Sequence, residues 1–138
     1  MIVLADTGAL YALLDRDDVW HSRVLEWWRL NGAVTVVPSS VLPEVCYLLQ
    51  RRIGPRAEEA FVRSVADGEF VLEDLEMQDV SRAADIMRQY EAFPVGFVDA
   101  SLVALAERLW TVDVLTTDRR HFTALRPRHA RALALHPG

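Results

Sequence analysis

The stretch Met1-Ile2-Val3-Leu4-Ala5-Asp6-Thr7-Gly8 decides the fold class of this chain. Its apolar residues predict a buried strand, and the helix-like run Ala9–Leu14 that follows places Asp6 where the strand ends. The pattern recurs downstream in Val112–Asp118, another β-branched run that ends in hydroxyls and an acid. Because open α/β sheets bind ligands beyond the carboxyl ends of their strands, acids at two such ends predict a metal site.

Strand-like and helix-like segments alternate along the chain, which predicts βαβ units. We expect an α/β fold: one domain over residues 1–138, with a central, mostly parallel sheet of about four to five strands and helices on both faces. The expected strands are 2–6, 33–37, 69–73, 112–116 and 130–134. The expected helices are 8–14, 18–30, 40–52, 56–67, 77–91 and 98–110.

Composition narrows the class of protein. The chain has a net charge of −5, which argues against binding nucleic acid by bulk electrostatics but leaves a nuclease open, because metal-binding carboxylates contribute to that charge. Cys46 is the only cysteine, so no internal disulfide forms, and no apolar run approaches the ~18 residues that span a bilayer. These features favour a cytoplasmic protein without a membrane segment.

Two further acids complete a candidate constellation with Asp6 and Asp118. Glu44 follows the second expected strand and borders an apolar stripe, and Asp99 lies in the first turn of a helix that is apolar almost all round. Converging carboxylates repel one another, and a hard divalent cation such as magnesium or manganese relieves that repulsion.

Each of these acids also has a purely structural interpretation. Asp6 and Asp99 suit helix N-termini, Asp118 suits a turn, and Glu44 suits a solvated helix face. Unrelated caps and turns would rarely reproduce all four positions in this order.

The chain resembles the PIN-domain family, and within it the VapC-type toxins of bacterial toxin–antitoxin pairs. The resemblance covers nearly the whole length and rests on Leu4–Leu10, the Glu44 helix, Gly96–Ala106 and Leu115–Phe122. It implies a magnesium- or manganese-dependent endoribonuclease that hydrolyses RNA and is neutralised by a small cognate VapB-like antitoxin, as a homodimer or a toxin–antitoxin hetero-oligomer.

The resemblance also implies roles for individual residues. Asp6, Glu44, Asp99 and Asp118 match the family's acidic catalytic and metal-binding positions, and Thr7 and Thr116 match its hydroxyl positions, where they would orient ligand waters. Many relatives carry a further acid where this chain has Arg119-Arg120-His121. The departure suggests a weak second metal site, and Arg119 and Arg120 become candidate contacts to RNA phosphates.

Trp27 and Trp28 are adjacent, so both cannot face the same interior. We expect one of them to contribute to a protein interface, because the resemblance implies an antitoxin groove near the first helices.

Three other functions compete with the ribonuclease. Asp6-Thr7-Gly8 also matches the triplet of aspartic proteases, but those proteins are rich in β-structure. A magnesium-dependent phosphatase with Asp6 as nucleophile would need a second Asp where Gly8 stands and a lysine, and all fifteen basic residues here are arginine. A PIN-fold binding module with weak or lost catalysis stays open.

Overall fold

Five parallel strands form a single sheet in the computed structural model, which describes residues 1–138. The strand order is β3-β2-β1-β4-β5, with β1 in the centre. The strands are β1 (Ile2–Ala5), β2 (Val34–Pro38), β3 (Val71–Glu73), β4 (Asp113–Leu115) and β5 (Ala134–His136). The prediction of an α/β fold is confirmed, and every pair of neighbouring strands is parallel.

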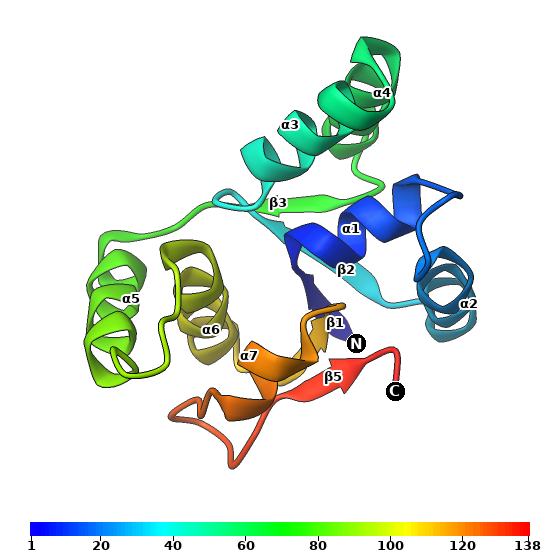
Figure 1. Ribbon diagram of the computed structural model, residues 1–138. Helices are drawn as coiled ribbons and strands as arrows, with labels where there is room; N and C mark the ends of the chain where they lie inside the picture. Colours follow the sequence, from blue (N-terminus) through cyan, green and yellow to red (C-terminus); the bar gives the residue numbers. More distant parts are fainter.

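Seven helices cover the two faces of this sheet. They are α1 (Thr7–Leu14), α2 (His21–Asn31), α3 (Leu42–Arg52), α4 (Pro55–Ala66), α5 (Met77–Gln89), α6 (Phe97–Leu109) and α7 (Arg119–Ala124). The first four pack against one face and α5, α6 and α7 against the other, while α3 and α4 lie side by side as a projecting pair (Figure 1). None of the seven is both long and apolar enough to cross a membrane.

The alternation of side chains along β1 explains the two cores. Val3 and Ala5 join the cluster beneath α1 to α4, whereas Leu4 joins the cluster beneath α5 to α7, and all three are fully buried. A strand covered on both faces has no polar side, which is why the sequence opens with a continuous apolar run.

Most elements lie within two residues of their expected bounds, and three differences are larger. The last strand begins at Ala134 rather than at residue 130, because its register is set by pairing with β4, where Asp113 lies opposite Ala134. Helix α2 begins three residues late, since the Asp18 side chain accepts a hydrogen bond from the backbone of Trp20 and forms a turn there. Helix α7 was not expected at all; it has only six residues, too few for a periodic pattern.

Candidate active site

Three of the four predicted acids follow the carboxyl ends of adjacent strands. Asp6 comes directly after β1, Glu44 lies in the first turn of α3 after β2, and Asp118 follows β4. Asp99 reaches the same region from the first turn of α6. The strand order reverses between β1 and β4, and this is where open α/β sheets bind their ligands.

Asp6 is buried, with 6% of its surface exposed, and two hydrogen bonds fix its carboxylate. It caps α1, where its Oδ1 accepts from the backbone N–H of Ala9 at 2.9 Å. Its Oδ2 accepts from the hydroxyl of Thr116, which is fully buried and itself accepts from the backbone N–H of Asp118 at 2.9 Å. Thr116 therefore links the carboxylate of Asp6 to the backbone of Asp118, where the family resemblance implied only that it orients water.

Thr7 has a similar task on the other side of the site. Its hydroxyl donates to Glu44 Oε1 at 2.8 Å and so ties the first turn of α1 to the first turn of α3. Glu44 is exposed, and this bond is the only side-chain hydrogen bond that it forms. The bond orients a flexible side chain toward the carboxyl ends of the strands.

Gly8 allows α1 to approach the turn after β4. A Cβ built at this position would lie 2.6 Å from Thr117 Oγ1, far inside the normal contact distance. The glycine in the Asp6-Thr7-Gly8 triplet is therefore explained by close packing.

Asp99, Asp118 and His121 form the tightest group of donor atoms. One donor atom from each lies within 4.8 Å of the others, a spacing that could hold a metal ion. His121 Nδ1 lies 2.8 Å from Asp118 Oδ2, and Asp118 Oδ1 accepts from the backbone N–H of His121 as the cap of α7. In the sequence, His121 stands out only as part of the Arg119-Arg120-His121 departure. Its position three residues after an acid at a helix start was the available signal.

The electrostatics of Asp6 favour a positive ligand. Burial raises the pKa of Asp6 to about 7, although the hydrogen bonds from Thr116 and Ala9 lower it. The negative charges of Asp99 and Asp118 raise this pKa further. A buried carboxyl next to two other acids is costly to ionise without a cation.

Asp99 is in the same situation. Burial raises its pKa to about 6, the charge of Asp118 adds to the rise, His121 opposes it, and Glu44 adds a smaller contribution. No arginine forms an ion pair with any of the four acids. The donor set of carboxylate oxygens, with one imidazole, fits a hard divalent cation of the magnesium or manganese type.

Comparison with known proteins decides the family, since the PIN-domain model matches residues 3–126. The chain belongs to the PIN-domain family. Its sequence is 38% identical over 125 residues to Ribonuclease VapC26 of Mycobacterium tuberculosis (strain ATCC 25618 / H37Rv), covering 91% of this chain and 93% of that protein. The resemblance to VapC-type toxins expected from the sequence is thereby confirmed.

Solved structures share the PIN fold. VapC20 of Mycobacterium tuberculosis, described as a sarcin-ricin loop cleaving toxin, aligns with a TM-score of 0.79 at 22% identity, covering 86% of this chain and 91% of its own. DNA-bound VapBC from Salmonella typhimurium aligns with a TM-score of 0.73 at 19% identity, covering 98% and 97%. A toxin-antitoxin complex from Klebsiella pneumoniae aligns with a TM-score of 0.69 at 15% identity, covering 89% and 92%.

The two candidate phosphate contacts of this PIN domain lie on α7, beside the acids. Both are exposed. The Arg119 guanidinium donates to the carbonyl oxygen of Pro137 at 2.7 Å, which ties it to the C-terminal segment. The Arg120 guanidinium lies over the ring of Phe93, 5.5 Å from its centroid. Contact with RNA stays a prediction for both.

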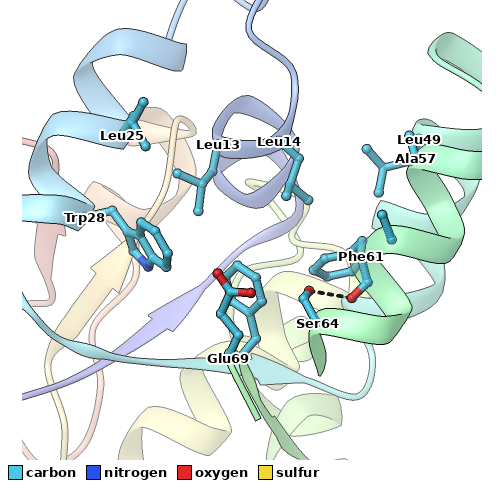
Figure 2. Close-up of a pocket in the computed structure, with 11 residues that line it drawn as sticks. Leu13, Leu14, Leu25, Trp28, Leu49, Ala57, Phe61, Ser64 and Glu69 are labelled. Atoms are coloured by element: carbon cyan, nitrogen blue, oxygen red, sulfur yellow. Dashed lines mark hydrogen bonds between the residues drawn. The ribbon is translucent and has the colours of Figure 1, made fainter. Parts of the chain in front are cut away.

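An apolar groove opens among α1, α2, α3 and α4, and none of the four acids lines it. Figure 2 shows Leu13 and Leu14 on one side of it and Ala57 and Phe61 on the other, with Trp28 at one end. Nine of its eleven lining residues are hydrophobic, and its volume is about 300 Å³. The groove gives this PIN domain a second surface suited to a ligand.

Neither tryptophan of the predicted interface pair is fully buried. Trp28 lines the groove, stacks on Phe70 and donates from Nε1 to Thr35 Oγ1 at 2.8 Å. Trp27 points elsewhere and stacks on His136, with 4.6 Å between the ring centroids. Of the two, Trp28 is the one placed to take part in an interface at the groove.

Proposed function

We propose that this chain is a VapC-type toxin: a magnesium- or manganese-dependent endoribonuclease that hydrolyses RNA phosphodiester bonds and is neutralised by a cognate antitoxin. One observation carries the proposal, namely the convergence of Asp6, Glu44, Asp99 and Asp118 with no arginine to balance them. The similarity to Ribonuclease VapC26 supports the reaction class. Action in the cytoplasm stays a prediction from the sequence.

In this proposal the chain's own residues hold and orient the reactants. Asp99 and Asp118 provide the nearest carboxylate oxygens, with Asp6 and Glu44 at the sides of the same site. A bound divalent cation would supply an activated water and polarise the phosphoryl oxygen. Thr116 keeps Asp6 in place, and His121 steadies Asp118.

The test is cleavage of total bacterial RNA by purified, antitoxin-free protein, with magnesium, with manganese and with chelator. Asp99→Asn keeps the shape of the side chain but removes its charge. We expect it to lower cleavage by more than roughly 100-fold, beyond the loss typical of groups that only orient ligands. The matched control is Asp85→Asn, an exposed acid on α5, which should cleave like the native protein.

Discrete fragments that disappear with chelator and with Asp99→Asn would support the proposal. Intact RNA under every condition, from protein shown to be folded and loaded with metal, would favour an inert binding module instead. A chelator-insensitive cleavage would exclude the proposed role of the four acids.

We further propose that the antitoxin docks in the apolar groove. A groove of this composition suits the apolar face of an amphipathic segment. It is lined by α1, α2, α3 and α4 rather than by the acids, so docking there and cleavage are separable by mutation. Formation of a homodimer or a toxin–antitoxin hetero-oligomer stays a prediction.

A further inference from the structure

We propose that Tyr47 is a base-stacking residue, which receives a nucleobase of the RNA next to the bond to be cleaved and thereby selects single-stranded segments. This inference rests on the proposed ribonuclease function and concerns how the same site recognises its substrate. It assigns a binding role to a side chain that the acidic constellation does not include.

Tyr47 lies beside Glu44, one of the four acids. It follows Glu44 by three residues on α3, a spacing that places both side chains on one face of the helix. Thr7, Glu44 and Tyr47 line one open cavity of about 440 Å³. That volume falls within the roughly 300–1,000 Å³ typical of small-ligand pockets, so a planar base has room beside the ring.

The ring of Tyr47 has no structural task in the folded chain. It is 58% exposed, its hydroxyl forms no hydrogen bond, and no other ring or guanidinium stacks on it. The other two tyrosines of the chain are engaged: the hydroxyl of Tyr11 donates to Asp15, and that of Tyr90 accepts from the backbone N–H of Arg126. Tyr47 therefore presents a free aromatic face and a free hydroxyl to solvent.

The charge of the chain favours a contact of this kind. A chain with net charge −5 and a cluster of acids at its site attracts RNA poorly through bulk electrostatics. Stacking of a base on an aromatic ring does not depend on the protein's charge. Arg51 lies four residues after Tyr47 on α3, exposed and without an ion pair, where it can meet the neighbouring phosphate.

Stacking on Tyr47 also carries selectivity for RNA structure. Bases in a duplex are stacked on one another and do not reach a side chain, whereas bases in loops and single strands do. The expected substrate is therefore an unpaired segment, with one base on Tyr47 and the adjoining phosphodiester at the acids.

The test compares two labelled oligoribonucleotides of roughly 12 nucleotides, one of mixed sequence and one that lacks the bases at its central positions. Binding is measured by fluorescence anisotropy in the Asp99→Asn background, which prevents cleavage. Tyr47→Ala should weaken binding of the base-bearing RNA by roughly 5-fold to 150-fold, the range that loss of one stacked base produces, and should leave the abasic RNA unchanged. Tyr47→Phe should retain binding, and Trp110→Ala, which removes an exposed aromatic at the far end of α6, should have no effect.

Equal weakening with both oligomers would overturn the inference, because a merely structural or electrostatic role does not distinguish them. Unchanged binding of the base-bearing RNA would overturn it as well, including the case in which Tyr47→Ala instead loses inhibition by the antitoxin. Failure of the proposed function has a different signature. Native protein would then bind the base-bearing RNA in a Tyr47-dependent manner but leave it intact.

Discussion

Thr116 shows how much a single hydroxyl does in this site. It is fully buried, donates to the carboxylate of Asp6 and accepts from the backbone N–H of Asp118. One side chain thus orients both Asp6, which follows β1, and the loop after β4. Side chains that hold metal ligands in place in this way typically affect metal affinity as well as the orientation of the ligands.

Thr116→Val removes both hydrogen bonds and nearly keeps the volume. We expect a loss of about 1–3 kcal/mol in the free energy of unfolding, because a buried backbone N–H and a buried carboxylate each lose a partner. We also expect roughly a 10–100-fold loss of metal affinity or cleavage. Chemical denaturation and manganese titration measure the two effects. Thr116→Ser, which keeps the hydroxyl, should behave like the native protein, and equal losses in both variants would contradict this role.

The raised pKa values of Asp6 and Asp99 make the stability of the metal-free protein depend on pH. Burial raises their pKa values to about 7 and about 6 from the ordinary value of 3.8, so the folded chain binds these protons more tightly than the unfolded chain does. Because ionising these groups costs stability, the free energy of unfolding falls as the pH rises from about 4 to about 7. A bound divalent cation removes that cost, and protons compete with it.

Thermal unfolding of chelator-treated protein should therefore show a higher Tm at pH 6 than at pH 8, by roughly 5–10 °C. Magnesium or manganese should raise Tm most at pH 8 and least at pH 6. Asp6→Asn should flatten the dependence of the metal-free protein, whereas Asp85→Asn should not. A metal-free Tm that rises toward pH 8 would contradict the assignment.

At the scale of the elements, the site depends on how closely α1 approaches the turn after β4. Gly8 stands in the first turn of α1, and the space that a Cβ would need is occupied by Thr117 Oγ1. The contact brings the first turn of α1 against the turn that follows β4. Backbone proximity, rather than conformational freedom, explains this glycine.

Gly8→Ala should cost about 1–3 kcal/mol, because the added methyl must displace the Thr117 hydroxyl or shift α1. The double variant Gly8→Ala/Thr117→Ala removes the clashing hydroxyl and should recover most of the stability. Gly96→Ala, at a glycine with nothing within 4 Å of the added Cβ, is the matched control and should change little. Chemical denaturation provides the comparison. If the double variant is no more stable than Gly8→Ala, the close approach to Thr117 is not what requires glycine.

At the scale of the whole molecule, cleavage and inhibition use separate surfaces in our proposal. The acids lie at the carboxyl ends of the strands, and the apolar groove lies among α1 to α4. Ala60 is an exposed residue that lines this groove, so a larger side chain there blocks the groove without disturbing the core.

Ala60→Arg should weaken inhibition by the cognate antitoxin by at least roughly 10-fold, because a charged side chain must then be buried on docking. RNA cleavage in the absence of antitoxin should stay at the native level. The measurement is cleavage against antitoxin concentration for both proteins. Arg88→Ala, at an exposed position on α5, is the control and should leave inhibition unchanged. Native inhibition of the Ala60→Arg protein would exclude the groove as the docking site.

Local pattern in the chain was enough to predict four of the five strands, six of the helices, the α/β fold and the positions of the four acids. The apolar composition of the buried strands and of helix α6 predicts their burial, since a segment covered on every side has no polar face. The order of acids along the chain then indicated the PIN family, which the comparisons confirm.

Tertiary structure alone decided the rest, because the decisive contacts join residues far apart in sequence. The bond of Thr116 to Asp6 spans 110 positions, and that of Thr7 to Glu44 spans 37. No local pattern encodes such pairs, nor the placement of His121 beside Asp99, nor the register that moves β5 to Ala134. The sequence by itself determined which residues are acidic and which are apolar. Only the packing of the sheet and helices determined which of them meet, because burial and electrostatic coupling exist only between groups that the fold brings together.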